Sequence, residues 1–171
     1  MSIRKFLLVS YIVSIIFSFG WLYRNKLFKL KEIFSDSYRD DEEFLLEIYI
    51  PRIKLREVIY NIDSSLNKVD YHVEILNNSN LENNLFFLAA HSGSGRASYF
   101  DNLVFLEKGD IVWLSSDIDY AFVVVDKFYI QKDGYFEANY DSKGDTLFLI
   151  TCSLRYVDKQ LIVRAKLIYK C

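Results

Sequence analysis

Short runs of β-favouring residues, separated by turn residues, recur from residue 44 to the C-terminus. Leu46, Ile48 and Ile50 alternate with Glu47 and Tyr49, which is the period of a strand with one buried face. Similar runs rich in aliphatic and aromatic residues follow at residues 58–61, 73–76, 85–90, 111–115, 120–130, 146–152 and 161–169. A helical turn is expected over 99–106. About eight strands with one or two short helices predict an all-β domain, either a closed barrel or a sandwich.

Length and composition narrow the possible classes of protein. The 171 residues are enough for one domain with a substantial core. The 13 tyrosines and 14 phenylalanines favour strands. A net charge of −2 and a pI near 5.7 give no basic surface, so no nucleic-acid partner is expected.

The N-terminus carries a long apolar run, residues 6–23, that contains no charged side chain. Arg4 and Lys5 precede it, and Arg24 and Lys26 follow it. As a helix the run would span about 27 Å, which matches the hydrocarbon core of a bilayer. We therefore expect a transmembrane signal-anchor.

The expected topology places residues 1–5 in the cytoplasm and the large domain outside the cell, in a single-pass protein of the cell membrane. A cleaved signal peptide is the alternative, because Ser18 and Gly20 are small residues at positions that a signal peptidase recognises. Residues 24–43 are amphipathic and then acidic, which indicates a stalk or linker. The folded domain is expected over 44–171.

A cysteine ends one of the most apolar strands. The run 146–152 closes with Cys152, and a short polar turn separates it from the run 161–169. A thiol at the end of a rigid strand and beside a loop is well placed for a nucleophile. A buried structural cysteine is the alternative.

A histidine occupies the corresponding position on another apolar strand. His91 follows the run 85–90 and begins a loop of small residues, whereas His72 lies among polar neighbours and is expected at the surface. One cysteine and one histidine at the ends of apolar strands indicate cysteine nucleophile chemistry. A core or capping role for His91 is the alternative.

Neither a metal site nor a disulfide is expected. The two histidines and two cysteines lack the local spacing of zinc ligands. If the last two strands form an antiparallel hairpin, Cys152 lies opposite Gln160, and Cys171 lies at the far end, roughly 30 Å away. Both thiols should then be free.

Three motifs together resemble the sortase family, and the strands at 47–53 and 161–167 resemble its first and last strands. The motifs are Leu149-Ile150-Thr151-Cys152, Leu88-Ala89-Ala90-His91-Ser92-Gly93, and the stretch from Phe100-Asp101-Asn102-Leu103 to Lys108-Gly109-Asp110. Sortases are membrane-anchored cysteine transpeptidases of Gram-positive-type cell surfaces. The resemblance implies a closed, sortase-like eight-stranded barrel with His91 and Cys152 on neighbouring strands.

The sequence departs from the family pattern at two positions. Phe148 replaces a threonine of the cysteine motif, and Gln160 stands where the catalytic arginine normally opens the final strand. Glutamine can donate a hydrogen bond to an oxyanion but brings no charge, so transition-state stabilisation is weakened there. Arg164 on the same strand and Arg155 on the preceding turn are the other candidates for this role.

The resemblance implies a cysteine transpeptidase without a cofactor. Cys152 would attack a peptide bond in an LPxTG-like sorting signal of a surface protein and form a thioester, with His91 moving the protons. An amine acceptor, such as a cell-wall precursor or a pilin lysine, would then receive the acyl group.

Three other interpretations stay open. One is a catalytically decayed domain that only binds surface peptides. Another is a thiol hydrolase that uses the same pair with water as the acceptor. The last is a structural β-domain in which the cysteine and the histidine are unrelated and lie apart.

Overall fold

Eight strands in one sheet form the framework of the described part of the chain, residues 44–132 and 144–171 of a computed structural model. Two short 3₁₀-helices, η1 (Pro51–Ile53) and η2 (Asp101–Phe105), lie between strands. The strands are β1 (Phe44–Ile50), β2 (Leu55–Tyr60), β3 (Glu74–Ile75), β4 (Leu85–Ala89), β5 (Ile111–Ser115), β6 (Asp119–Gln131), β7 (Thr146–Cys152) and β8 (Lys159–Lys170). The prediction of an all-β domain with few and short helices is confirmed for these residues.

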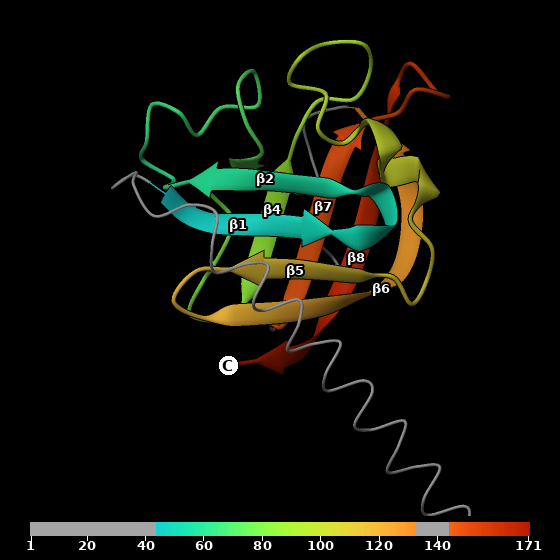
Figure 1. Cartoon of the computed structure of the whole chain (residues 1–171). Helices are drawn as coiled ribbons and strands as arrows, with labels where there is room; N and C mark the ends of the chain where they lie inside the picture. The colour runs from blue at the N-terminus through green and yellow to red at the C-terminus, as the bar shows by residue number, and fades with distance from the viewer. Residues whose placement is uncertain (1–43, 133–143) are drawn as a thin grey trace, which may run out of the picture. The chain divides into compact units, whose positions relative to one another are not determined.

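The sheet closes almost completely on itself. Its strand order is β2-β1-β5-β6-β8-β7-β4-β3, and every pair is antiparallel except β4 with β7. The two edge strands, β2 and β3, contact each other. In Figure 1, β1, β2 and β5 cross in front of β4, β7 and β8. The fold is therefore a nearly closed barrel rather than a sandwich.

Strands β4, β7 and β8 bury both of their faces. One face lines the central core inside the barrel, with Phe86, Leu88, Leu147, Leu149 and Val163. The other face belongs to a second core, formed by Leu85, Phe87, Phe148, Ile150 and Ile162. Strands buried on both faces are continuously apolar, and this explains why the runs 85–90 and 147–150 show no alternation.

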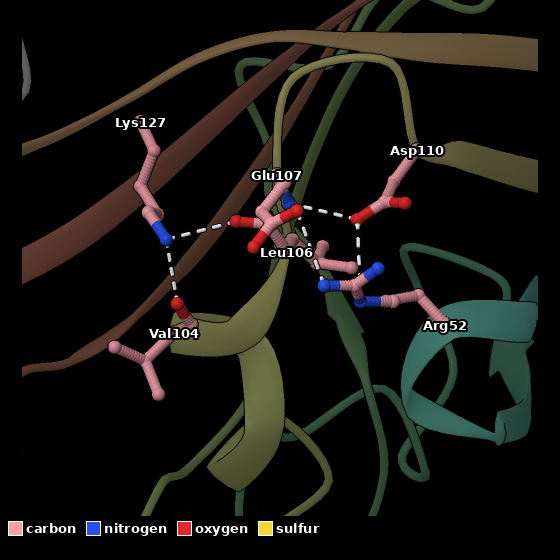
Figure 2. Close-up of polar contacts among 6 residues, drawn as sticks. All are labelled: Arg52, Val104, Leu106, Glu107, Asp110 and Lys127. Atoms are coloured by element: carbon pink, nitrogen blue, oxygen red, sulfur yellow. Dashed lines mark hydrogen bonds and ion pairs between the residues drawn. The ribbon is translucent and has the colours of Figure 1, made fainter.

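Helix η2 is held at its C-terminal end by charged side chains (Figure 2). Lys127 of β6 donates from Nζ to the carbonyl oxygens of Val104 (2.5 Å) and Leu106 (2.8 Å). Carbonyls at a helix end have no partner within the helix, so a lysine there supplies the missing donor. Arg52 of η1 contacts Glu107 at 3.1 Å, just after η2. These contacts fix a helix that borders the candidate site.

The second strand begins earlier than the pattern predicts. The sequence places it at 58–61, whereas β2 starts at Leu55. Lys54 adopts a left-handed conformation with φ 53° and ends η1, so the chain turns sharply and the strand follows at once. A left-handed residue other than glycine leaves little signal in the sequence.

The expected membrane span (6–23) and the stalk (24–43) lie outside the described residues. Within residues 44–132 and 144–171, no helix has the length and apolar character needed to cross a bilayer.

Strand β1 buries one charged side chain, and its pairing gives a stability prediction. Glu47 is 5% exposed, and Arg56 of β2 places Nε 2.8 Å from its Oε1. Burial raises the pKa of the Glu47 carboxyl, and Arg56 opposes this rise. We expect Arg56→Met to lower the free energy of unfolding at pH 7 by about 2–4 kcal/mol, because a buried carboxylate loses its partner.

The effect should depend on pH in a defined direction. The pKa of Glu47 is higher in the folded than in the unfolded protein, so the cost of burying its charge is present at neutral pH. That cost disappears as the pH falls through the folded pKa. Urea unfolding should therefore show a smaller deficit for Arg56→Met near pH 4 than at pH 7. Arg52→Met, which removes the contacts of a half-exposed guanidinium with Glu107 and Asp110, is the control and should cost under about 1 kcal/mol at both pH values. A deficit of equal size at both pH values would contradict this account.

Candidate active site

The parallel pairing of β4 with β7 brings the predicted cysteine and histidine together. Ala89 of β4 pairs with Ile150 of β7. Two residues further along both strands, this register sets His91 beside Cys152. Neighbouring strands lie about 4.8 Å apart, so the backbones of the two residues lie at adjacent positions at the same edge of the barrel.

Hydrogen bonds hold this register beyond the end of β4. The amide of Ala90 donates to the carbonyl of Ile150 (3.2 Å), and the hydroxyl of Thr151 donates to the carbonyl of Ala90 (2.8 Å). The hydroxyl of Ser92 donates to the carbonyl of Cys152 (2.6 Å). Cys152 itself is partly exposed and has a free thiol. The interpretation in which the cysteine and the histidine lie apart is therefore wrong, and Cys152 is not fully buried.

Two of the three candidates for the arginine role lie on β8. Gln160 pairs directly with Cys152, as the hairpin predicted. Arg164 pairs with Phe148, four residues earlier on β7, which is about 13 Å from Cys152 along the strand. Its guanidinium contacts both carboxylate oxygens of Asp126, at 3.0 and 2.5 Å. Arg164 is therefore engaged in a bidentate ion pair at another level of the barrel.

The third candidate, Arg155, shares a pocket with the cysteine. This open pocket has a volume of about 120 Å³. Its lining consists of Ser92, Phe100, Asp101, Val104, Tyr129, Thr151, Cys152, Ser153, Leu154, Arg155 and Leu161. The hydroxyl of Ser153 accepts hydrogen bonds from the amides of Arg155 (3.2 Å) and Tyr156 (2.9 Å), which orders the turn after Cys152. The guanidinium of Arg155 lies over the ring of Tyr156, 5.4 Å from its centroid.

The structure also decides which side chains of β8 share a face with the cysteine. Leu161 and Val163 point into the central core. Ile162 belongs to the second core together with Ile150. Because side chains alternate along a strand, Cys152 lies on the face of Ile150, and its partner Gln160 lies on the face of Ile162.

An aspartate that the sequence analysis missed contacts the histidine. Oδ1 of Asp70 lies 3.1 Å from Nε2 of His91. Asp70 comes from the loop between β2 and β3 and belongs to no motif, so no pattern could have assigned it. The expectation for His72 was wrong in part: its side chain is only 23% exposed, Nδ1 contacts Glu57 at 3.2 Å, and its ring lies against Tyr60.

The second cysteine lies far from this site. Cys171 is exposed and follows the end of β8, where its backbone exchanges two hydrogen bonds of 3.0 Å with Asp119. Gln160 and Cys152 lie near the opposite end of β8. The predicted separation of the two thiols along the hairpin is confirmed.

Comparison with known families identifies the fold. A sequence model described as the sortase domain matches residues 48–168. The chain belongs to the sortase family. Sortases are cysteine transpeptidases, and the matched range includes His91, Cys152 and all three candidates for the arginine role.

Solved sortase structures resemble this sortase domain over most of its length. Sortase C from Streptococcus pneumoniae matches with 26% identity and a TM-score of 0.64, covering 77% of this chain and 73% of that one. Sortase C-1 from Actinomyces oris matches with 26% identity and a TM-score of 0.65, covering 76% and 77%. Sortase A from Corynebacterium diphtheriae, at 22% identity and a TM-score of 0.63 over 77% and 63% of the two chains, supports the fold alone. Comparison with curated protein sequences gives no significant match.

Proposed function

We propose that this sortase cleaves a sorting signal through a thioester on Cys152 and transfers the acyl group to an amine. The observation that carries the proposal is the register that sets His91 beside Cys152 at the edge of a sortase barrel. A thiol and an imidazole side by side supply a nucleophile and a group that both takes and gives protons.

In the first step the sulfur of Cys152 attacks the carbonyl carbon of the scissile peptide bond. The thiol proton passes to His91, and a tetrahedral intermediate forms. The bond between carbon and nitrogen then breaks, His91 returns the proton to the departing amine, and a thioester remains on Cys152.

In the second step an incoming amine attacks the thioester. His91 takes a proton from this amine, the carbon–sulfur bond breaks, and the thiolate of Cys152 is released. The proton on His91 then restores the thiol. One amide bond is exchanged for another, so no cofactor or net oxidation is needed.

The sorting signal has an apolar surface to bind beside the nucleophile. The pocket that Cys152 lines also contains Val104, Tyr129 and Leu154, and Val104 and Leu154 are exposed. We assign the contact with an apolar residue of an LPxTG-like signal to this pocket.

Arg155 is our candidate for stabilising the oxyanion of the tetrahedral intermediate. It lines the pocket that holds Cys152, whereas Arg164 is bound to Asp126. Gln160, directly opposite Cys152, can add a neutral hydrogen bond. We expect Arg155→Gln to lower kcat by about 10- to 100-fold, because the positive charge that balances the developing oxyanion is lost. Steady-state kinetics with a fluorogenic signal peptide measures this.

Arg164→Gln is the matched control for that prediction. It breaks the ion pair with Asp126, so we expect a lower melting temperature and a kcat within about threefold of the original. A tenfold loss of kcat in Arg164→Gln, with Arg155→Gln unaffected, would reverse the assignment.

The proposed location follows from the N-terminal apolar run. We infer a single-pass membrane protein whose residues 6–23 anchor the chain and whose sortase domain lies outside the cell. Its acceptor would then be an amine of the cell wall or of a pilin. Pilin is the substrate class named for the S. pneumoniae sortase C.

A transpeptidation assay tests the proposed function. The full-length chain in detergent micelles is incubated with LPxTG-like peptides, with and without an amine acceptor such as triglycine or a lysine peptide. Mass spectrometry should detect the cleaved signal joined to the amine. Hydrolysed peptide alone, in equal amount with and without amine, would support a thiol hydrolase instead. Peptide binding without any product would support a decayed binding domain. The observation that favours this alternative is Gln160, which stands where the family has its catalytic arginine.

A further inference from the structure

Among the described residues, Asp70 is the only acidic residue with a contact to the side chain of His91. Its Oδ1 lies 3.1 Å from Nε2 of His91, and both side chains reach solvent. The two residues come from different loops, Asp70 from the segment between β2 and β3 and His91 from the segment after β4. Their contact therefore depends on how these two loops are held.

The chemistry of the pair determines the state of the imidazole ring. A carboxylate oxygen only accepts hydrogen bonds, so Nε2 of His91 must carry the proton. In the neutral ring Nδ1 is then the basic nitrogen, and it is the atom that can take the proton of a thiol or of an amine. When His91 holds both protons, the same carboxylate balances its positive charge.

Two adjacent residues tie both loops together. The hydroxyl of Tyr99 donates to the carbonyl of Tyr71, next to Asp70 (3.1 Å). The amide of Phe100 donates to the carbonyl of His91 (3.1 Å). Burial raises the pKa of Tyr99 above its usual value of 10.0, so its hydroxyl stays a donor at neutral pH.

The loop that carries Asp70 is also fixed from within. The buried side chain of Asn67 exchanges two hydrogen bonds with the backbone of Ile75, at 2.8 and 3.0 Å. The amides of Tyr71 and His72 donate to the carbonyl of Lys68, at 2.9 and 3.0 Å. The carboxylate is thus presented by an ordered turn.

We propose that Asp70 is a positioning residue that holds His91, through Nε2, with Nδ1 free for proton transfer at Cys152. This inference rests on the proposed function and deepens it. Asp70 acts through the histidine, and the structure describes no contact between its carboxylate and the thiol.

A substrate-free measurement tests the coupling directly. Cys152 in the full-length chain, carrying Cys171→Ser so that only one thiol reacts, is alkylated with iodoacetamide. We expect Asp70→Ala to slow the alkylation about fivefold, the effect of a partly exposed ion pair. In a His91→Ala background the same change should have no further effect, because a positioning residue acts only through the group that it holds. Asp63→Ala, in the same loop and exposed, is the matched control and should leave the rate unchanged.

Turnover provides the second measurement. Asp70→Ala should lower kcat about fivefold and leave KM within about twofold, and Asp70→Asn, which keeps an acceptor oxygen, should recover part of the loss. The inference would be overturned if Asp70→Ala slowed alkylation equally with and without His91. It would also be overturned if Asp70→Ala left the rate unchanged in both backgrounds. Because alkylation needs no peptide, coupling without any transpeptidation would contradict the proposed function and still support the contact.

Discussion

Replacement of Cys152 by alanine is expected to abolish transpeptidation, with a loss of at least about 10⁴-fold in kcat/KM. The thiol is the only group in the proposed mechanism that forms a covalent bond to the acyl fragment, and no other step compensates for its loss. Cys152 ends β7 with a partly exposed side chain, so alanine should leave the fold intact. Product formation from an LPxTG-like peptide and an amine measures the effect.

Cys171→Ser is the matched control for that experiment. Cys171 is exposed and lies at the other end of the β8 strand, so its replacement should leave the rate unchanged. Retained activity in Cys152→Ala, or lost activity in Cys171→Ser, would place the nucleophile elsewhere.

The second large effect is expected for His91→Ala. Without the imidazole, the proposed mechanism loses the group that takes the thiol proton and protonates the leaving amine, and we expect kcat to fall by about 10²- to 10⁴-fold. A pre-steady-state experiment should show slower formation of the thioester as well as slower release. The free energy of unfolding should change little, because the His91 side chain is 45% exposed.

His72→Ala is the control for the loss of a histidine. Its ring packs on Tyr60 and contacts Glu57, so its removal should lower the melting temperature and leave kcat nearly unchanged. A loss of kcat in His72→Ala that matches the loss in His91→Ala would exclude the proposed role of His91.

The sequence predicted pairings between neighbouring strands better than pairings between strands that lie far apart along the chain. The hairpin of β7 and β8 follows from two apolar runs joined by a short turn, and it correctly placed Gln160 opposite Cys152. The parallel pairing of β4 with β7 joins segments about sixty residues apart, and nothing in either run specifies its partner. Proximity of His91 to Cys152 was therefore predicted from their chemistry and from the family resemblance, not from the strand pattern.

In the candidate site, too, the sequence did not predict contacts between segments that lie far apart along the chain. The residue pattern of β8 does not show which of its side chains face the inside of the barrel, because Leu161 and Ile162 are both apolar and strands buried on both faces carry no alternation. The ion pair of Arg164 with Asp126 joins β8 to β6, and the contact of Asp70 with His91 joins two loops. Such contacts depend on tertiary structure, which a single sequence does not display.

The most direct test of the central claim is the mass of the intact full-length chain after incubation with LPxTG-like peptides in the absence of amine. We predict a mass increase equal to the acyl fragment, mapped by proteolysis to Cys152 and strongly reduced in His91→Ala. Adding an amine should discharge this adduct and yield the joined product. Absence of an adduct on every peptide, although iodoacetamide still alkylates Cys152, or an adduct mapped to Cys171, would contradict the account.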